Sequence, residues 1–87
     1  MSQLALDTTG VPLSRIVAEI LEVPPSAITD QSSREQFARW DSLGSILLMT
    51  ALERRYQVRF TLAELMTVRT VGDIKAALGR HGVVADG

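Results

Sequence analysis

The sequence predicts an all-α fold: a small four-helix bundle with three main helices, one short third helix and a long ordered loop between the first two helices. Apolar residues recur at helical spacing in segments that begin near residues 12, 42 and 70. Helix-start signatures precede the second, third and fourth helices. The only strand-like stretch, residues 58–60, is too short for a sheet.

The first helix is expected over about residues 12–22, with apolar side chains on one face and charged side chains on the other. Pro12 suits the first turn, where its missing N–H costs nothing. The Pro24-Pro25 pair ends the helix, because a proline pushes the residue before it out of the helical region.

Residues 23–41 form a long connection that contains four apolar residues, Val23, Ile28, Phe37 and Trp40. Loops of this length are usually functional or disordered. The apolar anchors favour a functional loop that is pinned to the core. Ser33 and Gln36 have capping-box spacing, which predicts a single helical turn inside the loop.

The second helix is expected from Asp41 or Ser42 to about Tyr56, with Asp41 as its N-cap. Capping boxes predict a short helix after Thr61 and a fourth helix after Thr70, which Gly79 and Gly82 should end. The expected core residues are Ile16, Val17, Ile20, Leu48, Leu52, Val71, Ile74 and Leu78.

Length and composition restrict the number of domains and the kinds of site that the chain can form. Eighty-seven residues fit one domain, expected over residues 11–80 with a flexible leader at 1–10 and a flexible tail at 81–87. The chain has no cysteine and one histidine, His81, so no metal site is expected, and a solvated role is expected for this histidine at the glycine-rich end. No apolar run is long enough to span a membrane and no secretory signal is visible, so the expected location is the cytoplasm.

The inventory of reactive groups argues against an enzyme. The acids are scattered, and no Gly-rich phosphate loop is present. The net charge of −1 argues against nucleic-acid binding, although residues 34–87 carry eight bases against six acids, and seven of these bases are arginine.

The conspicuous segment is Trp40-Asp41-Ser42-Leu43-Gly44, at the junction of the long loop and the longest helix. Ser42 is expected to be exposed at the positive end of the helix dipole, where a phosphate is stabilised. The simpler interpretation is that Asp41 and Ser42 only cap the helix.

In these features the chain resembles the acyl carrier protein family, which includes the peptidyl carriers. The resemblance covers about residues 11–80. The resemblance rests on the tripeptide Asp41-Ser42-Leu43, the helix that follows this tripeptide, the loop sequence from Val23 to Ser33, and the helix start Thr70-Val71-Gly72-Asp73-Ile74.

The resemblance implies that Ser42 carries a covalent 4′-phosphopantetheine arm within an attachment motif completed by Asp41 and Leu43. A phosphopantetheinyl transferase would add the arm from coenzyme A. Its thiol would hold an acyl or aminoacyl group as a thioester for a loading ligase or acyltransferase and for downstream acyl-processing enzymes. The carrier would act as a monomer and catalyse nothing itself. Ser45, one turn after Ser42, has no matching role.

Family partners usually contact the second helix and the turn around the serine. Here that face would comprise Leu43, Leu47, Thr50, Glu53, Arg54 and Val68. The chain departs from fatty-acid carriers, which are strongly acidic along this helix, and looks more like a discrete carrier of a specialised pathway, such as polyketide or nonribosomal peptide synthesis.

Two other interpretations stay open on the sequence alone. In one, the chain is an unmodified helical protein-interaction module in which Ser42 is only part of a helix start. In the other, it is a small DNA-binding domain that uses the arginines, although no helix has a basic base-reading face.

Overall fold

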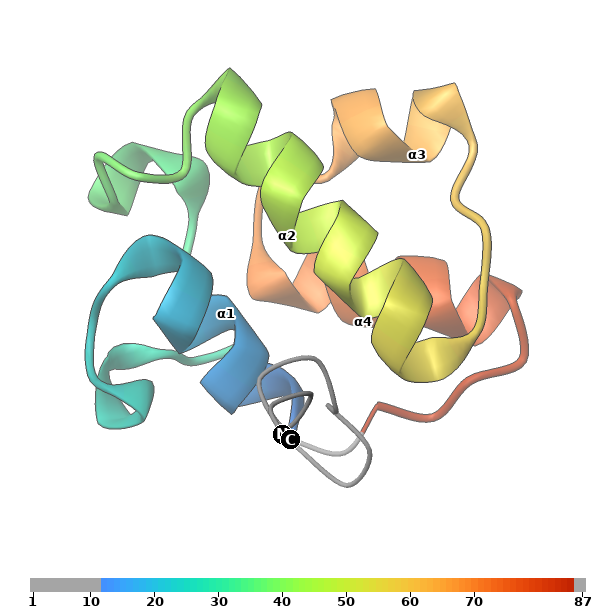
Figure 1. Cartoon of the computed structure of the whole chain (residues 1–87), viewed down its shortest axis with the longest axis horizontal. Coiled ribbons are helices and arrows are strands. Elements are labelled where there is room, and N and C mark those ends of the chain that lie inside the picture. The colour runs from blue at the N-terminus through green and yellow to red at the C-terminus, as the bar shows by residue number, and fades with distance from the viewer. Residues whose placement is uncertain (1–11, 86–87) are drawn as a thin grey trace, which may run out of the picture.

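The computed structural model describes residues 12–85, so the predicted leader lies outside the described residues. The elements follow in the order α1 (Leu13–Leu21), η2 (Pro25–Ala27), η3 (Arg34–Gln36), α2 (Ser42–Tyr56), α3 (Leu62–Thr67) and α4 (Val71–Arg80). In Figure 1, α2 crosses the molecule between α1 and α3. The predicted all-α bundle with a short third helix is confirmed.

The predicted helix starts are confirmed by side-chain caps. The Asp41 carboxylate accepts a hydrogen bond from the Gly44 N–H at 2.8 Å, which satisfies one of the free donors of the first turn of α2. Thr61 and Thr70 each open a reciprocal capping box, with Glu64 and Asp73 as the returning carboxylates.

The end of α4 differs from the prediction, because Gly79 lies inside the helix and only Gly82 belongs to its termination. Gly82 has φ 80°, and the Val83 N–H donates to the Leu78 carbonyl at 2.9 Å. This is a Schellman ending, in which the left-handed residue follows the helix. The prediction that Gly79 ends the helix is wrong, because Gly79 lies inside α4 and its position does not require a left-handed backbone.

The predicted core is confirmed, apart from Ile20, which is only partly buried. The α1 helix makes its most extensive contacts with α2, and α2 also contacts α3. Leu48 and Leu52 from α2 and Ile74 and Leu78 from α4 all belong to the core and have no exposed surface. The α2 helix is therefore central to the fold.

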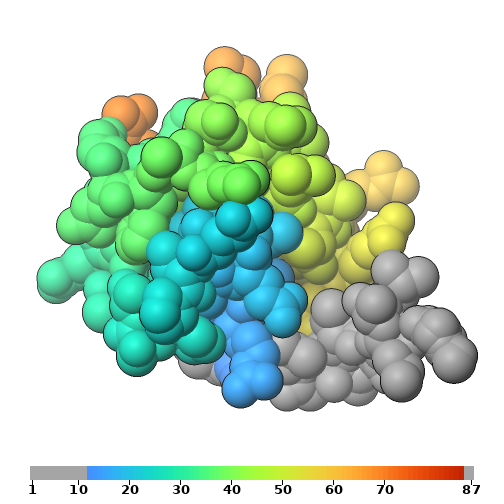
Figure 2. All heavy atoms as spheres, turned by 60° about the vertical axis from the view of Figure 1, so that its left-hand side comes forward, coloured from blue at the N-terminus to red at the C-terminus, as the bar shows by residue number. Residues whose placement is uncertain are grey.

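The long loop is held to the core by its apolar residues, as predicted. Trp40 is 2% exposed and Ile28 9%, and Val23 and Phe37 pack against the same core. Figure 2 shows the loop, in teal and green, as a surface continuous with α1 in blue and the start of α2.

Backbone hydrogen bonds fix the loop to the start of α4. The Arg34 N–H donates to the Arg69 carbonyl at 2.9 Å, and the Val71 N–H donates to the Ser32 carbonyl at 3.0 Å. The ion pair of Lys75 with Asp30 at 2.6 Å adds a side-chain link. The loop is thus anchored on α4 before it returns to α2.

The loop then passes so close to α2 that only glycine fits at position 44. A Cβ on Gly44 would overlap the carbonyl oxygen of Arg39. Gly44 is buried, one turn from the Asp41 cap. Its missing side chain is what allows the loop and the helix to meet at this distance.

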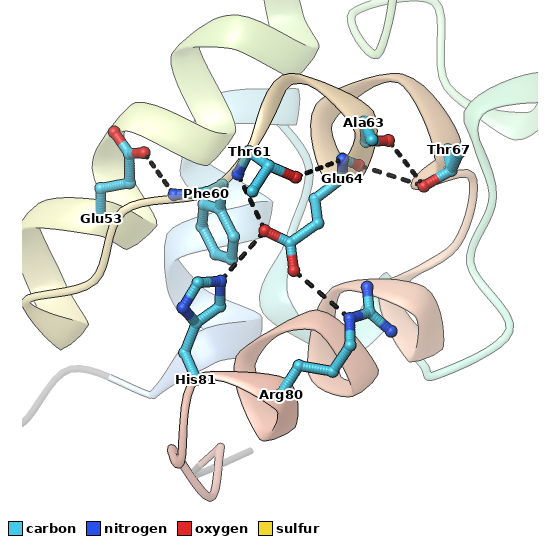
Figure 3. A network of polar contacts seen from close by, with 8 residues as sticks. All are labelled: Glu53, Phe60, Thr61, Ala63, Glu64, Thr67, Arg80 and His81. Atoms are coloured by element: carbon cyan, nitrogen blue, oxygen red, sulfur yellow. Dashed lines mark hydrogen bonds and ion pairs between the residues drawn. The ribbon is translucent and has the colours of Figure 1, made fainter.

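A polar network joins α3 to the end of α4 (Figure 3). One carboxylate oxygen of Glu64 accepts from the Thr61 N–H at 2.8 Å and from His81 Nε2 at 3.0 Å. The other pairs with Arg80 Nε at 3.3 Å. The His81 ring also lies edge-on to Phe60, with 5.6 Å between ring centroids.

The expectation that His81 is merely solvated is therefore wrong. The sequence could not show that Glu64 lies opposite the end of α4. Val83 and Ala85 also pack against the core, within the segment predicted as a tail, while residues 86–87 lie outside the described residues. Flexibility of this tail stays a prediction.

We predict that Gly44→Ala destabilises the domain by about 1–3 kcal/mol, because the added methyl group forces the loop and α2 apart. The matched control is Gly79→Ala. A Cβ there would meet nothing within 4 Å, so it should gain about 0.5–1 kcal/mol from helix propensity. Urea unfolding of both variants measures the difference. Equal effects would contradict the close approach at Gly44.

A second prediction concerns acid stability. The hydrogen bond from His81 and then that from the Thr61 N–H lower the pKa of Glu64 from 4.5 to about 2. The folded pKa lies below the unfolded value, so the stabilisation is complete above pH 4.5 and is lost as the pH falls toward 2.

Glu64→Gln should therefore lower the unfolding free energy at pH 7 by about 1.5–3 kcal/mol, the usual value for hydrogen bonds to a charged group. The difference in unfolding free energy between Glu64→Gln and the unsubstituted protein should become smaller below pH 4.5. Glu19→Gln, at an exposed position on α1, serves as the control. A gap that stays constant with pH would show that the charge of Glu64 is not what stabilises α3.

Candidate functional site

Ser42 occupies the first position of α2, directly after its N-cap. The buried Trp40 and the capping carboxylate of Asp41 fix the backbone on one side, and Gly44 fixes it on the other. Between these constraints the Ser42 side chain is exposed. A hydroxyl so placed is accessible to another enzyme and lies near the positive end of the α2 dipole.

A groove of about 310 Å³ begins beside Ser42 and runs between α2 and α3. Its lining residues are Arg34, Ser42, Ser45, Ile46, Leu62, Leu65 and Met66. Arg34 comes from η3 in the long loop, so residues of η3, α2 and α3 line the groove.

Ser45 has the hydroxyl that the fold leaves unsatisfied. Its Oγ is shielded from solvent and has no hydrogen-bond partner among the described residues. A buried hydroxyl without a partner costs about 1–3 kcal/mol, so such groups in folded proteins need an explanation. Ser45 was predicted to have no role from the sequence alone. The sequence does not show that the residue lines the groove or that its Oγ is unpaired.

The site is not strongly acidic, and several of the charged side chains in and beside the long loop are paired with one another. The first turn of α2 holds no acidic residue, and Arg54 and Arg55 lie in its last turn. Arg39 pairs with Glu22 at 3.0 Å, and Glu35 of η3 pairs with Arg69 at 3.2 Å. Arg34 makes no ion pair with the part of the chain that the structure describes.

An exposed face of α2, apolar in its first half, follows the site. Leu43 is 64% exposed and Leu47 50%, and Thr50 and Arg54 continue this face at helical spacing. These four positions lie on the surface, where the sequence predicted them.

The other two predicted partner positions do not lie on this face. Val68 is only 4% exposed and belongs to the core, so its predicted place on the surface is wrong. Glu53 is half-buried, and its carboxylate accepts a hydrogen bond from the Phe60 N–H at 2.8 Å, which fixes the connection between α2 and α3. One of its carboxylate oxygens is thus used inside the fold, and a contact role for Glu53 stays a prediction.

Three exposed apolar residues at the groove were missed: Ile46 at 57%, Leu62 at 71% and Met66 at 68%. Leu62 and Met66 are spaced i, i+4, a signal that could have placed them on one face of α3. A six-residue helix is too short for its apolar pattern to show which face is buried.

Within residues 12–85, no helix has the length and apolar character needed to cross a membrane. The same residues bring together no group of three potential metal ligands.

Comparison with known families gives one match. The model of the family described as "Phosphopantetheine attachment site" matches residues 12–78. No curated protein and no solved structure matches the chain.

The residues of the site fit 4′-phosphopantetheine, the group that this family binds covalently. An exposed serine hydroxyl is a suitable point for a phosphodiester, and the α2 dipole and the Arg34 guanidinium favour its negative charge. The unpaired Ser45 hydroxyl and the apolar groove walls suit the amide and methyl groups of the arm. Because the match covers most of the chain, from α1 to α4, the protein belongs to the phosphopantetheine-binding family of acyl and peptidyl carrier proteins.

Proposed function

We propose that Ser42 is the attachment point of the 4′-phosphopantetheine arm, with Asp41 and Leu43 completing the motif, and that the chain itself catalyses no reaction. Members of the family are modified by a phosphopantetheinyl transferase and interact with acyl-processing enzymes. The observation that carries the proposal is the exposed Ser42 at the capped start of α2, inside the matched region. The thiol of the attached arm supplies the thioester chemistry.

Each neighbour of Ser42 has a role in this proposal. Asp41 caps the helix and holds the first turn, so the serine meets the transferase in a fixed orientation. Leu43, which is 64% exposed, offers an apolar contact directly beside the hydroxyl. Gly44 leaves room for the loop, so that no side chain covers the site.

We further propose that the partners belong to a specialised pathway, such as polyketide or nonribosomal peptide synthesis. The support is the surface of α2, which presents Leu43, Leu47, Thr50 and Arg54 in place of acidic side chains. A partner that binds this face gains mainly from apolar burial, and charge contributes less. A monomeric state and a cytoplasmic location stay predictions.

The first test is modification of the protein by a broad-specificity phosphopantetheinyl transferase with coenzyme A, followed by intact-mass measurement. Ser42→Ala should gain no mass, and its unfolding free energy should change by less than about 0.5 kcal/mol, as expected at an exposed position. Ser45→Ala is the matched control and should be modified fully. A modified Ser42→Ala protein, or an unmodified parent, would refute the proposed site. The second result would favour an unmodified interaction module.

A further prediction concerns how partners bind. Leu47→Asp should stay folded and lower the rate of arm transfer by about tenfold, which corresponds to 1.4 kcal/mol of lost apolar contact. Leu52 has no exposed surface, so Leu52→Asp should unfold the domain by placing a charge in the core. Circular dichroism and transfer kinetics distinguish the two variants.

Ionic strength gives the complementary measurement. Salt screens charges but leaves apolar contacts intact, so the transfer rate should change little between low and high salt. A steep decrease with salt, together with a large effect of Arg54→Glu, would mean that arginines make the main contacts, with an acidic partner surface.

A further inference from the structure

The chain has very few side chains that react with a thioester. It contains no cysteine, and every cationic residue except Lys75 is an arginine, whose guanidinium stays protonated and is not a nucleophile. Lys75 is the only lysine in the sequence and therefore the only side-chain amine. An amine matters for a protein that carries a thioester, because it attacks the thioester and keeps the acyl group as a stable amide.

The structure holds the Lys75 ammonium in an ion pair. Its Nζ lies 2.6 Å from Asp30 Oδ1, and the lysine side chain is 29% exposed. The Asp30 carbonyl accepts a hydrogen bond from the Gly72 N–H at 2.8 Å, one turn before Lys75 on α4. A Cβ on Gly72 would lie 3.2 Å from that carbonyl oxygen, so glycine permits the close approach. The carboxylate is therefore presented to Lys75 by a fixed backbone.

Stability alone does not account for this ion pair. The Asp30 side chain is 65% exposed, and ion pairs at the surface add little to the free energy of folding. What the pair changes is the state of the amine, because an ammonium that donates to a carboxylate has no lone pair with which to attack a carbonyl carbon. The one histidine is also engaged by a carboxylate, since Nε2 of His81 lies 3.0 Å from Glu64 Oε1.

A thioester on an arm at Ser42 can approach much of the protein surface. From the serine oxygen to the sulfur the arm has as many bonds as about five extended residues, a span of roughly 17 Å. The domain itself measures 36 × 27 × 22 Å. A group tethered in this way has a high effective concentration around the protein that carries it. An unpaired amine within this range is exposed to acylation by the protein's own cargo.

We propose that Asp30 masks Lys75 against acylation by a thioester carried on Ser42. In the reaction that the ion pair suppresses, the Lys75 Nζ lone pair attacks the thioester carbonyl carbon, the N–C bond forms and the C–S bond breaks. The proton of the amine passes to the leaving thiolate. The products are an amide on Lys75 and a free thiol, with no oxidation or reduction, and the cargo is lost to partner enzymes. The inference rests on the proposed attachment at Ser42.

The test loads the protein by transferring acetyl-phosphopantetheine from acetyl-coenzyme A with a broad-specificity transferase. After incubation in mildly alkaline buffer, hydroxylamine removes acetyl groups from the thiol and leaves an amide on lysine in place. Intact mass gives the fraction of amide, and fragment ions locate it. A protein that gains no arm refutes the proposed function. A protein that gains the acetylated arm upholds that function and tests the masking of Lys75 alone.

Asp30→Asn should form the Lys75 amide about two- to fivefold faster than the unsubstituted protein, a ratio that matches the strength of an exposed ion pair. Asp30→Ala, which removes the carboxylate in a different way, should repeat this result. Asp30→Asn combined with Lys75→Arg should form no amide at this position. The matched control is Glu35→Gln, which breaks the ion pair of the same loop with Arg69 at 3.2 Å and releases no amine.

Equal rates of amide formation in both Asp30 variants and in the unsubstituted protein would overturn the inference. An amide on the N-terminal amine with Lys75 unmodified would do the same. Urea unfolding of each unloaded variant shows whether a faster reaction comes from a loosened fold. If Glu35→Gln accelerates the Lys75 amide as much as Asp30→Asn does, movement of the loop and not the lost Asp30 carboxylate is responsible, and the masking role is wrong.

Discussion

The close approach of the Arg39 carbonyl to Gly44 is the constraint on which the site depends. It brings the end of the long loop against the first turn of α2, where Trp40 enters the core and Asp41 becomes the N-cap. The side chains of Trp40 and Asp41 are used by the fold, and the Ser42 side chain is left exposed at the start of the helix. The other end of the loop is held by backbone bonds to the start of α4, so the whole segment is anchored at two places.

One side of the α3 helix is fixed to the rest of the fold, and its other side is exposed. Glu64 links it to its own N-terminus and to Arg80 and His81 at the end of α4. Its other side presents Leu62 and Met66 to the groove. A helix of six residues has little stability of its own, so the Glu64 network explains how α3 can form one wall of the groove. The backbone hydrogen bonds at the start of α4 therefore support the loop beside the site. The Glu64 network at the end of α4 supports α3.

Local signals in the sequence predicted the helices and the exposed serine, because caps and apolar spacing act within a few residues of one another. The Asp41 cap, both capping boxes and the four loop anchors are confirmed. Most of the errors concern contacts that extend beyond one helical turn. Val68 is buried by packing that its short helix could not reveal. The hydrogen bond that Glu53 accepts from a backbone N–H seven residues later was also not visible in the sequence. The groove beside Ser42, with Arg34 and Ser45 in its wall, forms only in the folded chain.

The central claim is that this carrier protein presents Ser42, and no other hydroxyl, for covalent attachment. Fragmentation mass spectrometry of the unsubstituted protein after reaction with a phosphopantetheinyl transferase tests it most directly, because Ser42 and Ser45 fall in the same peptide and fragment ions separate them. All of the added mass is expected on Ser42. Added mass on Ser45 or on any other residue would contradict it.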